Sequence, residues 1–219
     1  MRYDTVIFDL DGTLLDTIGD ITNCANHTLA LYGFEPKTYE EIKTYIGYGI
    51  DYFLERAYPP GRDDERYEDF VRDYKAYYLD HMTDKTIVYP GMYELLDELK
   101  RRGIKLGVVT NKFHTAASLI VEHFFSGTFS QVIGEGMGYA KKPDPETLNA
   151  AIEGLGADKA KTLYIGDSEA DITISEGAGV DCLIVTWGMR SREFMENYEP
   201  KPRYMIDDIK DFFNTVENS

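Results

Sequence analysis

The spacing of hydrophobic residues changes twice along the chain and divides it into three stretches. Residues 6–8 form a short apolar run, which is typical of a strand buried on both faces. Between residues 17 and 85 apolar residues recur every three or four positions, which indicates helices. From about residue 90 to residue 185 short apolar runs alternate with helical stretches. The pattern predicts an α/β protein in which a helical segment follows the first strand.

The limits of the predicted elements come from this spacing and from glycine and proline residues that interrupt it. Gly33, Pro59-Pro60-Gly61 and Gly103 are the clearest interruptions. Helices are expected at residues 18–32, from about 38, and at 51–57, 63–82, 91–102, 113–125, 144–155 and 167–177. Strands are expected at residues 6–8, 104–109, 131–133, 162–165 and 182–185.

Alternating strands and helices favour a parallel sheet with helices on both faces, a three-layer, Rossmann-like core. The first strand must belong to this sheet, so the helical segment is an insertion after that strand. We therefore predict a core domain made of residues 1–16 and 86–219 and an inserted all-helical domain made of residues 17–85.

Polar side chains follow the predicted strands where each one ends, which is where parallel α/β sheets bind ligands. Asp9 and Asp11 follow the first strand and, two positions apart, can face the same point. Two carboxylates aimed at one point repel each other unless a cation or a shared proton lies between them. The later strands and loops bring further polar groups to the same edge: Thr110-Asn111-Lys112, Lys141-Lys142, Gly166-Asp167-Ser168 and Asp171.

These groups together predict phosphoryl chemistry. Carboxylate oxygens with no Cys or His cluster nearby suit Mg²⁺. Lysine, hydroxyl groups and helix N-termini bind phosphate oxygens. One carboxylate can attack phosphorus as a nucleophile, and a second one can donate a proton to the leaving group and later accept one from water.

Four segments resemble, in order, the motifs of the haloacid dehalogenase-like hydrolase superfamily: Asp9-Leu10-Asp11-Gly12-Thr13, Thr110-Asn111, Lys142-Pro143-Asp144-Pro145 and Gly166-Asp167-Ser168-Glu169-Ala170-Asp171. The helical insertion resembles the cap that closes over the active site in that superfamily. This resemblance implies that Asp9 is the nucleophile and Asp11 the general acid and base. It also implies that Thr110 and Lys142, with Asn111, bind the substrate. The implied Mg²⁺ ligands are Asp9, the Asp11 carbonyl and Asp167, with Asp171 in support.

Residues 107–112 and the cap stretch 46–57 look most like phosphoglycolate phosphatases, so phosphoglycolate is the preferred substrate. Phosphatases of nucleotides, pyrophosphate or sugar phosphates share similar stretches, and a phosphomutase would use the same motifs. Tyr48 lies in the glycine-rich loop Gly47-Tyr48-Gly49, whose backbone can approach a ligand, so it is predicted to contact the substrate. A small polar residue is expected at this position in the cap loop, so a differently shaped pocket is expected. A 2-haloacid dehalogenase is disfavoured because it has no need of Asp11. A receiver-type signalling domain would be about half as long and would lack the insertion.

The net charge limits the possible binding partners, and the cysteine content bears on the cellular compartment. A net charge of −16 argues against nucleic acid and anionic membranes, which bind basic surfaces. Cys24 and Cys182 are too few for a disulfide framework, and no apolar run approaches ~18 residues or forms a signal peptide. We expect a cytoplasmic monomer or homodimer that acts on a small phosphorylated metabolite. The sequence leaves the roles of Lys112, Arg56 and Trp187 open.

Overall fold

The strand β1 (Thr5–Phe8) lies in the middle of a parallel six-stranded sheet of order β5-β4-β1-β6-β7-β8, in a computed structural model that describes residues 1–217. All four residues of β1 are buried, which agrees with its apolar sequence. The other strands are β4 (Lys105–Phe113), β5 (Gln131–Glu135), β6 (Thr162–Gly166), β7 (Asp181–Val185) and β8 (Tyr204–Ile206).

Helices cover both faces of this sheet. Successive residues of β1 point to opposite faces, so they pack against different helices. Val6 and Phe8 pack with α5 (Met92–Arg101), α6 (His114–Phe125) and α10 (Phe212–Glu217). Ile7 packs on the other face with α7 (Glu146–Gly154) and α8 (Glu169–Ala178). Near the edge of the sheet, Met195 of α9 (Arg192–Asn197) contacts the β7 residues. The three-layer α/β core is therefore confirmed.

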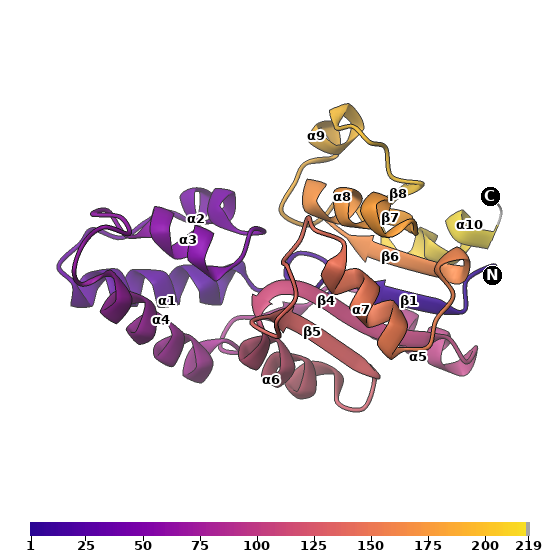
Figure 1. Cartoon of the computed structure of the whole chain (residues 1–219), viewed down its shortest axis with the longest axis horizontal. Coiled ribbons are helices and arrows are strands. Elements are labelled where there is room, and N and C mark those ends of the chain that lie inside the picture. The colour runs from indigo at the N-terminus through magenta and orange to yellow at the C-terminus, as the bar shows by residue number, and fades with distance from the viewer. Residues whose placement is uncertain (218–219) are drawn as a thin grey trace.

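A separate lobe of four helices lies beside the sheet (Figure 1). It contains α1 (Ile18–Leu31), α2 (Tyr39–Tyr45), α3 (Ile50–Ala57) and α4 (Tyr67–His81). Its interior is rich in aromatic rings: Tyr58 packs against Phe70 at 4.5 Å between ring centroids, and Phe53 against Tyr74 at 5.4 Å. The buried side chains of α4 that form part of this interior are Tyr67, Phe70, Tyr74 and Tyr78. The N-terminus and α10 lie at the far end of the core (Figure 1).

Two short strands join the cap lobe to the core. β2 (Leu15–Asp16) and β3 (Ile87–Val88) pair antiparallel at the points where the chain enters and leaves the helical lobe. The buried Asp20 fastens the same junction, since its carboxylate accepts hydrogen bonds from the backbone N–H groups of Lys85 and Thr86. These contacts hold the two passages together next to the predicted limits of the insertion.

Several elements were not predicted from the sequence. β2, β3 and β8 have only two or three residues, too few to show a period. The short helices α9 and α10 and the 3₁₀ turns η1 (Lys159–Lys161) and η2 (Ile209–Asp211) also lie outside the predicted set. β4 continues to Phe113, beyond the predicted end at residue 109, because Phe113 pairs with Glu135 after an irregularity in the ladder.

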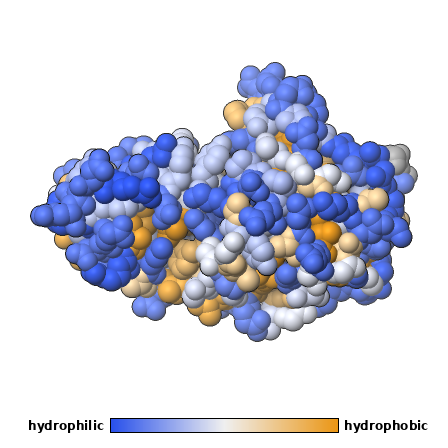
Figure 2. All heavy atoms as spheres, viewed as in Figure 1, coloured by the Kyte–Doolittle hydropathy of each residue, from blue (hydrophilic) through white to orange (hydrophobic). Residues whose placement is uncertain are grey.

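Hydrophilic residues cover most of the face shown in Figure 2, as expected for a chain with 28% charged residues. Within residues 1–217, no helix has both the length and the apolar character needed to cross a bilayer.

Candidate active site

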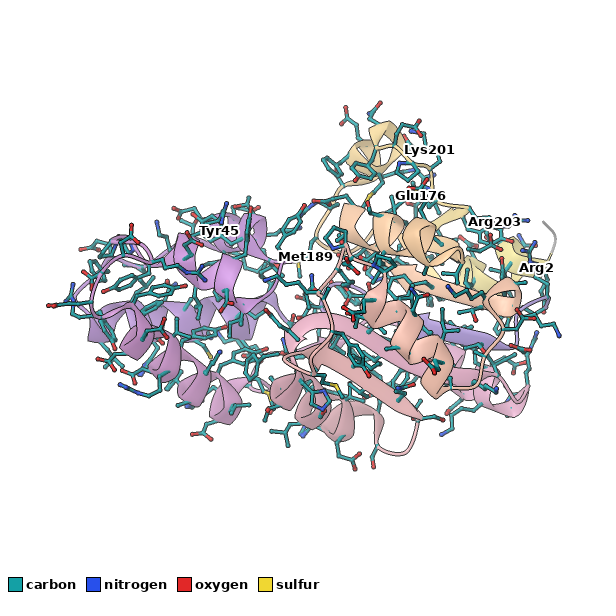
Figure 3. The ribbon with its side chains drawn as sticks, viewed as in Figure 1. Arg2, Tyr45, Glu176, Met189, Lys201 and Arg203 are labelled. Carbon is teal, nitrogen blue, oxygen red and sulfur yellow. The ribbon has the colours of Figure 1, made fainter. Side chains whose placement is uncertain are left out.

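The register of the sheet brings the predicted site residues to one edge. Phe8 pairs with Val108 on one side and Ile165 on the other, so the residues that follow all three strands are neighbours. The Asp9 N–H continues the ladder and donates to the Ile165 carbonyl at 2.8 Å. Met189, from the loop after β7, lies at this edge between the core and the cap (Figure 3).

Lys142 links two of the acidic residues. Its Nζ lies 2.9 Å from Asp9 Oδ1 and 2.8 Å from Asp171 Oδ1, and all three side chains are buried. Burial alone would lower the pKa of Lys142, but the carboxylates of Asp171 and Asp9 raise it above its ordinary value. Lys142 is therefore a permanent positive charge beside the predicted nucleophile.

Tyr164, in β6, forms a hydrogen bond with this lysine. It is fully buried in β6, and its hydroxyl accepts a hydrogen bond from Lys142 Nζ at 3.2 Å. The same hydroxyl lies 3.1 Å from both Asp171 Oδ1 and the Val109 carbonyl, the two acceptors available for its single proton. The sequence analysis missed Tyr164, because an aromatic residue in a buried strand gives no sign of a polar contact.

Asp171 is held by the start of α8. Its Oδ2 accepts from the N–H groups of Asp167 and Ser168 and from the Ser168 hydroxyl, which completes a capping box. Burial would raise the pKa of Asp171, but Lys142 and the Ser168 donors hold it below its ordinary value. Lys142 and Tyr164 contact Oδ1 of Asp171, and three donors contact its Oδ2. Asp171 therefore fits the supporting role better than that of a principal metal ligand.

Asp167 has a smaller set of partners. Oδ1 accepts from the Thr13 hydroxyl at 2.9 Å, and Oδ2 accepts from the Met189 N–H at 2.6 Å. Gly12 and Gly188 pack directly against this carboxylate, since a Cβ on either would come within 2.4 Å or 2.3 Å of Oδ2. Burial, with the nearby Asp171 and Asp9, raises the pKa of Asp167 well above its ordinary value.

Asp9, Asp167 and Asp171 form the acidic cluster that fits a metal ion. Within residues 1–217, each offers one oxygen, and these oxygens lie within 4.8 Å of one another. Burial raises the pKa of Asp9 to about 7 despite the opposing charge of Lys142. Asp9 Oδ1 is buried and has no hydrogen-bond partner among the described residues, so the ion pair with Lys142 is its main compensation. Three neighbouring carboxylates with one lysine beside them keep an excess of negative oxygen donors, which suits a hard divalent cation such as Mg²⁺.

The Asp11 side chain turns away from this cluster. Its Oδ1 accepts from the Thr17 hydroxyl at 2.7 Å and from Lys112 Nζ at 2.8 Å, and Lys112 also reaches Oδ2 at 3.1 Å. This placement agrees with a metal contact through the Asp11 carbonyl alone, and it puts the carboxylate in the cavity wall, apart from the acidic cluster. Lys112, whose role the sequence left open, is thus the partner of the predicted general acid.

Thr110 and Asn111 lie at the end of β4, and both are buried. The side-chain amide of Asn111 forms hydrogen bonds with backbone groups. Nδ2 donates to the carbonyls of Gly47 and Lys142, and Oδ1 accepts from the Lys142 N–H at 2.8 Å. Asn111 therefore positions Lys142 and the cap loop, and its predicted contact with the substrate stays a prediction. Thr110 accepts a hydrogen bond from the Lys112 N–H at 3.2 Å.

A cavity of about 70 Å³ lies between the strand ends and the cap. The core contributes Asp9, Asp11, Thr110, Asn111, Lys112, Phe113 and Lys142 to its wall. The cap contributes Ile21, Ile46, Gly47, Gly49, Ile50, Phe53, Tyr74 and Tyr78. The core side is therefore charged and the cap side mainly apolar.

Tyr48 contacts the core instead of this cavity. Its hydroxyl donates to Glu169, whose carboxylate also accepts from Arg190 at 2.8 and 3.0 Å. Tyr48 is absent from the described lining of this cavity and lines a larger, more open pocket with Tyr52 and Lys142. The predicted contact between Tyr48 and the substrate stays a prediction, and the observed contacts make Tyr48 part of a latch between cap and core.

Further contacts near the site come from the cap loop and from Arg56 and Trp187, whose roles the sequence left open. The Ile50 N–H donates to Glu135 at 3.2 Å, a further link between cap and core that the sequence did not reveal. Arg56 lies over the Tyr52 ring at 3.4 Å from its centroid, away from the cavity lining. Trp187 donates through Nε1 to the Thr13 carbonyl at 3.4 Å, so it packs behind the first motif.

Comparison with known proteins agrees with this geometry. Residues 6–185 match the family described as haloacid dehalogenase-like hydrolase. The chain is 34% identical to a phosphoglycolate phosphatase of Agrobacterium fabrum, over 93% of this chain and 88% of that protein. It is 30% identical to the pyrophosphatase PpaX of Bacillus cereus, over 100% of this chain and 98% of that protein.

A solved structure shows the same fold. The crystal structure of a candidate phosphoglycolate phosphatase from Lactobacillus delbrueckii has a TM-score of 0.87 at 31% identity, and the match covers 97% of each chain. The family match includes all four motifs that carry the acidic cluster and its lysine. The chain therefore belongs to the haloacid dehalogenase-like hydrolases, and it is a phosphatase of that family.

Proposed function

We propose that this phosphatase hydrolyses small phosphate monoesters with Mg²⁺ and uses Asp9 as its nucleophile. The placement of Asp9 carries the proposal: its carboxylate lines the cavity, pairs with Lys142 and lies beside Asp167 and Asp171. Asp9, Asp167 and the Asp11 carbonyl would hold Mg²⁺, with Asp171 in support. When bound, Mg²⁺ supplies positive charge that stabilises the charge developing on the phosphoryl oxygens.

The protein groups divide the reaction between them. Asp9 attacks phosphorus, and the bond between phosphorus and the leaving oxygen breaks while Asp11 donates a proton to that oxygen. Lys142 and Thr110 hold the phosphoryl oxygens in place, and Asn111 keeps Lys142 in position through its backbone. Asp11 then accepts a proton from a water molecule, which attacks phosphorus and releases phosphate from Asp9.

Phosphoglycolate is the substrate that we propose. The relatives named phosphoglycolate phosphatase and the small cavity both support a short leaving group. Pyrophosphate is the second candidate, because relatives named PpaX match the chain over its whole length. The cytoplasmic location and the monomeric or homodimeric state stay predictions.

A panel of purified phosphate compounds tests the proposal. Phosphoglycolate, pyrophosphate, a nucleoside monophosphate and glucose 1-phosphate are each incubated with the protein and Mg²⁺, and released phosphate is measured. We expect phosphoglycolate to have the highest kcat/KM and Asp9→Asn to remove activity on every compound. Transfer of the phosphoryl group to a sugar, without free phosphate, would contradict the proposal and would indicate a phosphomutase.

A further inference from the structure

Lys112 has hydrogen-bonding capacity that the protein leaves unused. Its side chain is only 4% exposed and lies in the cavity wall. An ammonium group has three protons. Two of them are directed to the oxygens of Asp11, at 2.8 and 3.1 Å, and no acceptor for the third is found among the described residues. A buried charge of this kind can bind a further anionic oxygen.

Tyr78, in the cap, supplies a second group of this kind at the same place. Lys112 Nζ lies 4.9 Å from the centroid of the Tyr78 ring, and both residues line the cavity. Tyr78 is fully buried, and its hydroxyl has no hydrogen-bond partner within residues 1–217. Because buried hydroxyl groups in native proteins nearly always have a partner, this one points to a partner that arrives from outside the chain.

Among the described residues, the only other cation in the cavity wall is Lys142, which pairs with Asp9 and Asp171 and donates to Tyr164. Most other cap side chains in the wall are apolar. In the proposed reaction Asp11 protonates the leaving oxygen, so Lys112 lies beside the leaving group. A substituent one or two bonds beyond that oxygen would therefore meet Lys112 and Tyr78.

We propose that Lys112 and Tyr78 form a subsite for a second anionic group on the leaving-group side of the substrate. This inference rests on the proposed function, because the role of Asp11 defines which end is the leaving-group side. Phosphoglycolate would place its carboxylate there, and pyrophosphate its second phosphate. A small ester without a second charge would leave the third Lys112 proton and the Tyr78 hydroxyl without a partner, which is how polar pockets reject incomplete ligands.

Binding to a protein that cannot turn over its ligand tests the subsite. In the Asp9→Asn background and with Mg²⁺ present, calorimetry compares phosphoglycolate and pyrophosphate with 2-hydroxyethyl phosphate, whose leaving group is uncharged. We expect one of the two anionic ligands to bind at least about tenfold more tightly than the neutral one, and the stronger of them identifies the source of the charge. Adding Lys112→Met should abolish this preference.

Three further variants separate recognition from folding. Lys112→Arg keeps the charge and should keep most of the preference. Tyr78→Phe should weaken the preference without lowering the melting temperature, because it removes a hydroxyl that has no partner in the protein. Lys100→Met removes a charge from the exposed surface of α5 and should change nothing.

Equal binding of anionic and neutral ligands, or a preference that survives Lys112→Met, would overturn the subsite. Equal loss of preference in the Met and Arg variants would do the same. These results are independent of the proposed function, which turnover by the wild-type protein decides. A wild-type protein that hydrolyses none of the panel refutes the function, and the binding comparison still decides the subsite.

Discussion

Replacing Tyr48 by Phe tests whether Tyr48 holds the cap loop on the core or contacts the substrate. The change removes one hydroxyl, which donates to a Glu169 carboxylate that Arg190 also holds with two hydrogen bonds. A hydrogen bond to a charged group contributes about 1.5–3 kcal/mol when buried. The Glu169 side chain is 13% exposed and water replaces the hydroxyl when the loop detaches, so we expect a loss of about 1–2 kcal/mol.

That loss should appear in the opening equilibrium of the loop. It corresponds to an opening constant that is about 5- to 30-fold larger, and amide hydrogen exchange of residues 46–50 measures this constant directly. Tyr48, Glu169 and Arg190 do not line the cavity between the strand ends and the cap, so kcat/KM should change by the same factor for every ester. Tyr52→Phe is the matched control, since its ring lies 5.0 Å from Tyr48 and no hydrogen bond of its hydroxyl is found within the described residues.

Two results would refute this reasoning. Unchanged exchange in Tyr48→Phe would mean that the contact with Glu169 does not hold the loop. A change in the ratio of kcat/KM values among esters would mean that Tyr48 contacts the substrate, as the sequence predicts.

Three other changes test the site. Gly188→Ala would place a Cβ 2.3 Å from Asp167 Oδ2, so the Mg²⁺ concentration for half-maximal activity should rise about 10- to 100-fold, while Gly19→Ala in α1 leaves it unchanged. Asp11→Asn should slow turnover of phosphoglycolate by about 10²- to 10⁴-fold, but it should slow phosphoryl transfer from a nitrophenyl ester to the enzyme much less. Equal losses in this first step for the two esters would exclude the acid role of Asp11. Mg²⁺ at about 100 times its dissociation constant should stabilise the fold by about 2.7 kcal/mol, seen as a higher melting temperature, and a similar shift in Asp167→Ala would show that the ion binds elsewhere.

Much of the fold could be predicted because the sheet is buried on both sides. Its central strands are continuous apolar runs, such as residues 6–8, that alternate with helical periods. The elements that escaped prediction are those that tertiary contacts create. β8 has three residues and β2 pairs with a strand about 70 residues away, so neither has a local signal.

The acidic side chains of the site were also predictable, because strand ends of a parallel sheet meet at one edge. The supporting contacts were not. Asn111 follows the motif, yet its amide contacts the backbone of Gly47 and Lys142, and only the folded chain brings those segments together. Glu169 and Arg190 are ordinary surface-type residues in the sequence, and they become a latch because the Tyr48 loop folds onto them.

Chemical trapping of the phosphorylated enzyme tests the central claim most directly. The protein is mixed with phosphoglycolate and Mg²⁺, quenched, and treated with borohydride, which reduces an acyl phosphate to an alcohol. Peptide mass spectrometry then locates the modified residue. The account predicts homoserine at position 9 and no homoserine in the Asp9→Asn protein. Homoserine at another aspartate, or none at all while phosphate is being released, would contradict it.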